Sequence, residues 1–343
     1  MKAKKVIKAI AFMLIFGVLF FSVQALLYGD SDTRDYKKVT AFFEEREESL
    51  DAVFLGSSAT YAFWTPAFAY GEYGITVYPL STARQMLLSA KYLIDDARKT
   101  QPDALYIVNL VSVETTNNYV HRLLDGYPNT LNKYKMIDYL SDKAGYSLSE
   151  RMEYYFPIIR FHSRWSELDA DDFKHAFDKH EDITHQGYLM QTGIDSVDPS
   201  DNRKPDDLLD VSLPKRAIEY LDKMTALCRE KGVELILVKA PTNSVRYYWY
   251  TEWDAQMVDY AEKNGLAYYS LVGKDEEMGL DWSTDTYDKG LHLNVYGAEK
   301  FTSYFGKILA ENHGIEDRRS DSEISAVWEA RIGSYYKERN GEK

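Results

Sequence analysis

The sequence predicts an α/β protein in which helices cover both faces of a central parallel sheet. Short apolar runs rich in β-branched and aromatic residues recur along the chain, and amphipathic helical patterns separate most of them. Strands that alternate with helices form βαβ units, whose strands lie parallel. The 343 residues are 45% hydrophobic, which is enough to build one large core.

The chain begins with a basic tail and an apolar helix. Residues 1–8 carry four lysines, and residues 9–27 contain no charged residue. A helix needs roughly 20 apolar residues to cross a hydrocarbon core of about 30 Å, and clustered lysines favour the cytoplasmic side. We therefore predict a cytoplasmic tail at 1–8 and a single-pass transmembrane signal anchor at 9–27, with the rest of the chain outside the cell membrane.

A cleavable signal peptide is the alternative, because Val23-Gln24-Ala25 resembles a small-residue cleavage site. The apolar run exceeds the usual 7–15 residues of a signal peptide, which favours the anchor. Both interpretations export the remaining chain. Residues 28–50 are polar, contain a helical pattern at 36–50, and are expected to form a stalk.

The folded domain is predicted to span 51–316. It should begin with a buried strand, since Asp51-Ala-Val-Phe-Leu-Gly56 is a short apolar run that ends in turn residues. The remaining strands are expected at 75–80, 104–110, 233–239 and 266–271. Helical patterns fall at 83–99, 213–231, 249–264 and 298–312.

Two segments depart from this alternation. Residues 112–210 are rich in Tyr, Asp and His with helical pieces at 135–144 and 171–180, and we predict a mainly helical, cap-like insertion. Residues 317–343 should form a C-terminal helix at 321–338. Its expected apolar stripe comprises Ile324, Val327, Trp328 and Ile332.

Composition excludes several classes of function. A net charge of −13 argues against nucleic-acid binding, which needs a positive face to displace phosphate counterions. The single cysteine, Cys228, permits no internal disulfide. His175, His180 and His185 are spaced by five, which does not stack ligands on one helical face, so we expect neither a metal nor another cofactor.

The segment Phe54-Leu-Gly-Ser-Ser58 places two serines directly after the first strand. Open α/β folds gather their ligands at the carboxyl ends of the strands, so a serine there is well placed to act. Gly56 permits a tight turn, and a helix that begins just beyond Ser58 aims N–H groups at a developing oxyanion. Taken alone, Gly-Ser-Ser is also an ordinary turn signal.

A second group of residues near the C-terminus favours a catalytic role for the serine over an ordinary turn. Asp285 and Asp288 precede His292 in one loop, and Asn294 and a helical pattern follow. A serine hydroxyl needs a base within hydrogen-bond reach and a carboxylate that fixes the imidazole tautomer. Ser58, His292 and one of the two aspartates can supply these roles.

The two motifs together resemble the SGNH/GDSL hydrolase superfamily, in particular its membrane-anchored bacterial surface branch. The resemblance covers about 51–111 and 212–312. It implies a flavodoxin-like three-layer sandwich with Ser58 as nucleophile and His292 as base. The family spacing is Asp-x-x-His, whereas Asp288 lies four residues before His292. A one-residue bulge at Gly290 can accommodate this difference, so we favour Asp288 as the orienting acid and keep Asp285 as its rival.

The family's oxyanion donors match this chain only in part. They are the nucleophile's N–H, a glycine after the second strand and an asparagine after the third. Ser81 stands at the glycine position and retains a backbone N–H, while Asn109 lies near the asparagine position or is simply a strand residue. Asn243 follows the fourth predicted strand at the same edge and is a candidate substrate contact, although a turn explains it equally well.

The expected function is that of an extracytoplasmic serine esterase or O-acyltransferase. The resemblance implies acyl esters of cell-envelope carbohydrate as substrate, O-acetyl polysaccharide or D-alanyl teichoic acid among them, with an acyl-exporting membrane protein as a potential partner. The second hypothesis is a non-catalytic envelope protein that binds glycan or an assembly partner in the same cleft, because two expected oxyanion donors are missing.

Overall fold

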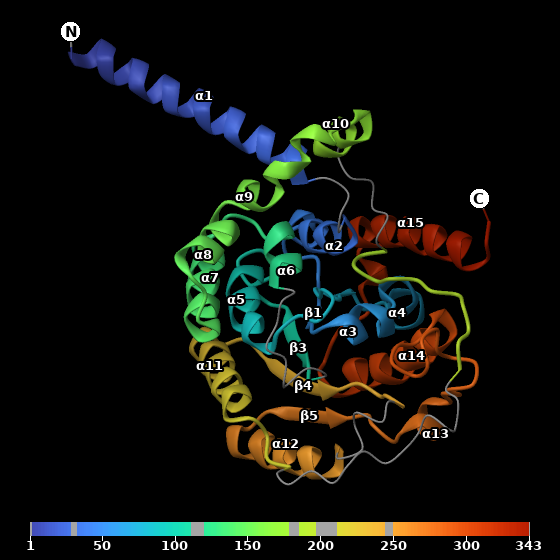
Figure 1. Ribbon diagram of the computed structural model, residues 1–343. Helices are drawn as coiled ribbons and strands as arrows, with labels where there is room; N and C mark the ends of the chain where they lie inside the picture. Colours follow the sequence, from blue (N-terminus) through green and yellow to red (C-terminus); the bar gives the residue numbers. More distant parts are fainter. Residues whose placement is uncertain are drawn as a thin grey trace.

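A computed structural model of the protein describes residues 2–28, 33–110, 120–177, 185–196, 211–243 and 250–342. Its centre is a five-stranded, all-parallel sheet with the order β2-β1-β3-β4-β5 (Figure 1), which is the flavodoxin-like order of doubly wound sheets. The predicted α/β class and the five predicted strands are therefore confirmed. The strands are β1 (Ala52–Leu55), β2 (Val77–Tyr78), β3 (Leu105–Asn109), β4 (Leu235–Lys239) and β5 (Ala267–Ser270).

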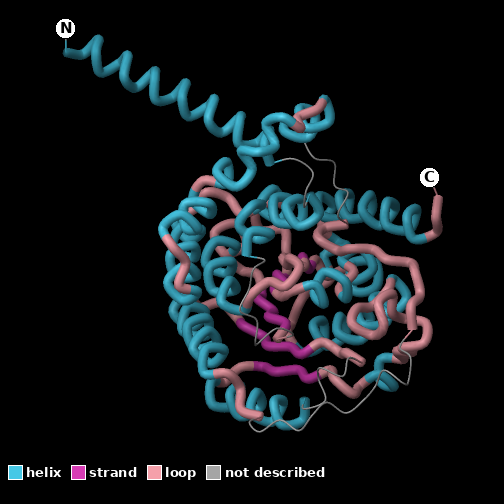
Figure 2. The backbone as a smooth tube through the Cα atoms, in the orientation of Figure 1, coloured by secondary structure: helices cyan, strands magenta, loops and turns pink. Residues whose placement is uncertain are grey.

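Helices surround the sheet, as Figure 2 shows. Those before the fourth strand are α1 (Lys2–Tyr28), α2 (Thr33–Glu44), α3 (Ser58–Phe63), α4 (Pro66–Tyr73), α5 (Leu87–Ala97), α6 (Val120–Gly126), α7 (Leu131–Ala144), α8 (Leu148–Tyr155), α9 (Pro157–Phe161), the 3-10 helix η1 (His162–Ser166), α10 (Ala170–Phe177) and α11 (Lys215–Lys231). Those after it are α12 (Tyr250–Asn264), α13 (Asp275–Met278), α14 (Val295–Asn312), η4 (Arg318–Ser320) and α15 (Ser322–Arg339).

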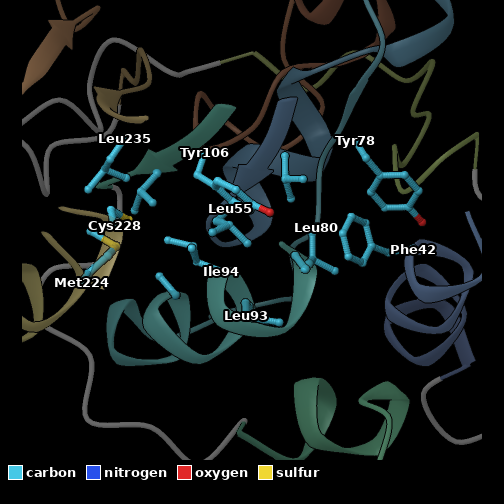
Figure 3. Close-up of a cluster of buried hydrophobic side chains, with 14 of the residues drawn as sticks. Phe42, Leu55, Tyr78, Leu80, Leu93, Ile94, Tyr106, Met224, Cys228 and Leu235 are labelled. Carbon is cyan, nitrogen blue, oxygen red and sulfur yellow. The ribbon is translucent and has the colours of Figure 1, made fainter. Parts of the chain in front are cut away.

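The sheet is buried on both faces, which explains why its strands are continuous apolar runs. Val53 and Leu55 of β1 point into a cluster with α5 and α11, which Figure 3 draws around Leu55, Ile94 and Cys228. Ala52 and Phe54, the alternate residues, point into a second cluster with α3, α4 and α14. The first strand is thereby held rigidly from both sides, close to the serines that follow it.

The N-terminal helix α1 projects from the body of the protein (Figure 1). Within it, Lys4–Leu27 has a mean hydropathy of 2.5 and is long and apolar enough to cross a membrane. This fits a single-pass membrane anchor. The end of the helix nevertheless touches the folded domain, through α9, η1 and α10.

Helix α2 does not stand apart from the domain as the predicted stalk would. Its apolar face packs inward, since Val39 and Phe42 are buried in the core. On the same helix the buried Lys38 ammonium lies 2.7 Å from Asp35 and 3.3 Å from the centre of the Tyr61 ring in α3. The amphipathic pattern thus marks a core helix rather than a spacer.

Helices α6–α10 occupy the region for which we predict an insertion. They contact α1, α2 and α5. The described part of this region that touches the loop around His292 is the extended segment 189–195. The helices therefore pack on α1, α2 and α5, and among the described residues of this region it is the short segment 189–195 that lies against the candidate site.

The C-terminal helix α15 forms where the sequence predicts it. Asp321 caps it by accepting hydrogen bonds from the backbone N–H groups of Glu323 and Ile324. The buried stripe differs in part from the expected one, because Ile324, Trp328 and Tyr335 are buried whereas Val327 is 50% exposed.

Candidate active site

Ser58 is the first residue of α3 and follows β1 after a two-residue turn. Gly56 is required in this turn, since a Cβ there would lie 2.1 Å from the Thr60 hydroxyl and 3.0 Å from the Cβ of Asn109. The backbone N–H of Thr60 donates to the Ser57 carbonyl at 2.9 Å, which closes the first turn of the helix. The close packing fixes Ser58 at the carboxyl end of a buried strand.

His292 lies on a short hairpin whose two arms meet at the bridge between Thr286 and Leu293. At its tip Lys289 and Gly290 have φ values of +59° and +78°, as expected for a type I′ turn. The Gly290 N–H donates to the Thr286 hydroxyl at 2.8 Å. The predicted backbone freedom at Gly290 is therefore used to bring residue 288 back toward residue 292.

Helix α14 secures the other end of this loop. Asn294 caps the helix, its side-chain oxygen accepting from the N–H groups of Tyr296 at 3.1 Å and Gly297 at 3.2 Å. Its amide nitrogen donates to the Thr284 carbonyl at 2.7 Å. One asparagine thus joins the helix start to both sides of the His292 loop.

The structure brings Ser58, His292 and Asp288 together in one chain of hydrogen bonds. Ser58 Oγ lies 2.6 Å from His292 Nε2. One oxygen of Asp288 contacts His292 Nδ1, and the other accepts from the backbone N–H of His292 at 2.7 Å. The imidazole is 12% exposed and stacks on the ring of Tyr287 at 5.7 Å between centroids.

Asp285 has a different environment. It is buried and accepts from Lys300 Nζ at 2.7 Å and from the Asp281 N–H at 2.8 Å. Its backbone carbonyl accepts from the N–H of Asn294 at 3.0 Å. Asp285 therefore holds the base of the loop, while Asp288 is the carboxylate that contacts His292.

The three remaining candidates surround this group without contacting His292 through their side chains in any described hydrogen bond. Ser81 pairs with Gly56 three residues beyond the end of β2, and its hydroxyl is buried without a hydrogen-bond partner in the described structure. Asn109 donates to the Thr60 hydroxyl at 3.2 Å and accepts from the Ala240 N–H at 3.3 Å. The Asn243 N–H donates to the Gly290 carbonyl at 3.2 Å. Their oxyanion or substrate roles stay predictions.

Sequence reasoning missed two supports of the loop. One is Tyr287, whose ring covers the imidazole. The other is segment 189–195, which bonds through its backbone to α3 and to the loop. The carbonyls of Gln191 and Asp195 accept from the N–H groups of Val295 and Lys289 at 2.7 and 2.9 Å. Backbone contacts of this kind depend little on side-chain type, so no sequence motif indicates them.

One of the three histidines spaced by five makes a contact at the C-terminal helix. His185 lies 2.6 Å from Glu338 of α15, whereas His180 lies outside the described residues. A cavity of about 270 Å³ lies between α1, α2 and the residues after α6, and its lining includes Phe21, Tyr36 and Lys133. It is separate from Ser58 and His292.

Fold and site together define an α/β protein with a Ser-His-Asp arrangement at the carboxyl end of its first sheet strand. No protein-family model matches the chain, and no curated protein matches its sequence.

Proposed function

We propose that this protein is a membrane-anchored serine esterase or O-acyltransferase that acts outside the membrane on acyl esters of cell-envelope carbohydrate. The observation that carries the proposal is the 2.6 Å contact between Ser58 Oγ and His292 Nε2. Such a contact lets a neutral imidazole take the hydroxyl proton as the oxygen attacks an acyl carbonyl. The resemblance of the two motifs to SGNH/GDSL hydrolases supports the same reaction.

Asp288 supports this role by selecting the tautomer. A carboxylate beside Nδ1 requires that nitrogen to carry the proton, which leaves Nε2 as an acceptor for the serine O–H. Because the same carboxylate also binds the His292 backbone N–H at 2.7 Å, the ring cannot turn away easily. Asp288 then stabilises the imidazolium that forms during attack.

The reaction divides into two steps. Ser58 Oγ attacks the acyl carbonyl, its proton passes to His292, and the protonated His292 gives that proton to the departing alcohol. The resulting acyl-enzyme is then attacked by water or by a sugar hydroxyl, with His292 again taking and returning the proton. The backbone N–H of Ser58 at the start of α3 and that of Ser81, which pairs with Gly56, are the donors proposed for the oxyanion.

The packing of α1 favours an uncleaved anchor over a removed signal peptide. The Phe20 ring contacts Phe156 at 6.3 Å between centroids, and Arg164 donates to the Leu27 carbonyl at 3.0 Å. Cleavage after Ala25 would remove the first of these contacts. A retained anchor places the site near the cell envelope, where polymer-linked acyl groups and an acyl-exporting membrane protein would be local partners.

The test is hydrolysis of p-nitrophenyl acetate by the full-length protein in detergent, together with labelling by a fluorophosphonate. We expect both to disappear in Ser58→Ala. Ser57→Ala is the matched control, because Ser57 precedes the helix and Ser58 supplies the hydroxyl that contacts His292. Unchanged hydrolysis in Ser58→Ala would refute the assignment.

One observation favours a second candidate, a non-catalytic glycan-binding protein. The Asn109 amide is engaged with Thr60 and Ala240 inside the fold, which leaves the third oxyanion donor unassigned. Loss of one donor costs about 10²- to 10³-fold in rate. Glycan binding together with a folded protein that fails to label at Ser58 would favour this alternative.

A further inference from the structure

Exposed apolar side chains gather in one stretch of the domain, the α9–α10 segment (residues 156–177). Four large hydrophobic residues within it are exposed, namely Phe156, Ile159, Trp165 and Phe173. Trp165, with 75% of its surface exposed, is the most open of these. Single exposed apolar residues are common on protein surfaces, but a cluster of aromatic and aliphatic side chains indicates a binding surface.

The α9–α10 segment surrounds the end of α1. All three of its helices, α9, η1 and α10, contact α1, and Figure 1 places α9 and α10 beside the end of α1 that joins the body. The Phe20 and Phe156 rings meet edge to face at 6.3 Å, and Arg164 donates to the Leu27 carbonyl at 3.0 Å. The segment thus contacts α1 at two positions along the helix axis.

These two contacts locate the segment relative to a bilayer. Phe20 precedes Leu27 by two turns, a distance of roughly 10 Å along a helix axis. Both residues belong to Lys4–Leu27, the part of α1 that is apolar enough to span a membrane. A bilayer crossed by this helix therefore reaches the level of α9, rather than ending below the domain.

We propose that the α9–α10 segment lies in the interface of the membrane that α1 crosses, with Trp165 and Phe173 inserted between lipid head groups and the upper acyl chains. This proposal rests on the membrane anchor of the proposed function but is independent of the catalytic assignment. Tryptophan is enriched at this level of membrane proteins, because its ring is apolar and its N–H stays near water.

Two arginines of the segment are paired with carboxylates. Arg160 forms an ion pair with Asp125, and Arg164 pairs with Asp172 at 2.7 Å. Both guanidinium groups are thus neutralised within the protein, which lowers the cost of placing them near lipid. Since the net charge is −13, attraction to anionic lipid does not supply the binding, and burial of apolar side chains does.

A second attachment to the membrane would fix the orientation of the domain relative to the bilayer. One helix alone would leave the domain free to swing about its end. A second attachment through the α9–α10 segment holds the domain at a fixed angle to the bilayer, and with it the height of Ser58 above the lipid. An acyl group delivered at the membrane would then meet the site from one direction.

The experiment measures depth by electron paramagnetic resonance on the full chain in phosphatidylcholine nanodiscs. Single spin labels are placed at Trp165→Cys and Phe173→Cys. Val23→Cys in α1 is the lipid reference. Leu148→Cys is the aqueous reference, because it is 76% exposed at the start of α8, one helix length from α9. The native Cys228 is buried with its thiol pKa raised to about 12 by desolvation, so it stays unlabelled.

We expect the ratio of oxygen to nickel-chelate accessibility at positions 165 and 173 to be several-fold higher than at 148 and close to that at 23. Adding phosphatidylglycerol should leave the ratio unchanged. Values at 165 and 173 equal to that at 148, in protein whose intact mass includes α1, would overturn the proposal. So would dipolar broadening at 165, since a second copy would then cover the patch.

Two further readouts separate this proposal from the proposed function. Loss of α1 from the purified protein, detected by intact mass, would overturn the anchor and the interfacial position together. Hydrolysis of p-nitrophenyl acetate by the same nanodisc sample reports the catalytic assignment alone. An active enzyme with water-exposed labels would therefore refute only the inference made here.

Discussion

At the scale of single residues, the orientation of His292 depends on which of two aspartates contacts its ring. Asp288 and Asp285 lie three positions apart on one loop, but the first contacts His292 whereas the second pairs with Lys300. The sequence favours Asp288 and keeps Asp285 as a rival, because Gly290 permits the tight return from Asp288 to His292 whereas Asp285 needs a wider turn. The type I′ turn at Lys289 and Gly290 decides between them.

We expect the two aspartates to respond differently to substitution. Asp288→Asn should reduce kcat by about 10²- to 10⁴-fold, since the amide favours the wrong imidazole tautomer. Asp285→Asn should instead reduce the free energy of unfolding by about 1–3 kcal/mol, because it weakens a buried hydrogen-bonded carboxylate. Steady-state kinetics and urea unfolding of both variants measure this. A larger loss of kcat in folded Asp285→Asn would exchange the two roles.

Ser81 offers a second test at this scale. If its backbone N–H is the oxyanion donor, Ser81→Ala retains that donor and should change kcat by less than about threefold, far below the cost of a lost donor. Removing a buried hydroxyl that has no hydrogen-bond partner among the described residues should leave stability equal or slightly higher. A hundredfold fall in kcat would mean that the hydroxyl itself binds the oxyanion, contrary to our assignment.

At the scale of elements, the sheet was predictable and the surroundings of the site were not. Strands buried on both faces leave a continuous apolar run, so β1, β3 and β4 are evident in the sequence. Helix α2 was expected as a stalk because it is mostly polar, yet Val39 and Phe42 suffice to bury one face. Segment 189–195 was missed because it binds through backbone groups.

Helix α7 carries a buried lysine that should make stability depend on pH. Desolvation lowers the pKa of Lys133 to about 8, while its ammonium donates to the Tyr127 carbonyl at 2.9 Å. The unfolded chain keeps the ordinary pKa, so between pH 8 and 10.5 the unfolded state binds more protons and stability contributed by this group rises with pH.

The matched comparison is wild type against Lys133→Met, which has no titrating group at this position. The difference in unfolding free energy between the two should shift in favour of the wild type by roughly 3 kcal/mol at most across that range. Urea unfolding at several pH values measures it. A difference that is independent of pH would show that Lys133 titrates normally.

At the scale of the whole molecule, the fold brings together a serine from the N-terminal part of the chain and a histidine and a carboxylate from its C-terminal part. The three side chains are linked by a series of hydrogen bonds. Ser58 follows the first strand and His292 precedes the helix α14, and the two groups are separated by 234 residues. The sequence led us to expect that these ends meet because the two motifs together resemble SGNH/GDSL hydrolases. It did not predict the packing of α1 on α9 and α10, because that contact depends on tertiary structure.

Trapping the acyl-enzyme tests the role of Ser58 as nucleophile most directly. Full-length protein is mixed with p-nitrophenyl acetate, quenched in acid within the first turnover, and digested for mass spectrometry. We expect one acetyl group on the peptide that contains Ser58, located on Ser58 itself and absent when His292 is replaced by Ala. No acetylation of the folded wild-type protein, or acetylation confined to another residue, would show that Ser58 is not the nucleophile.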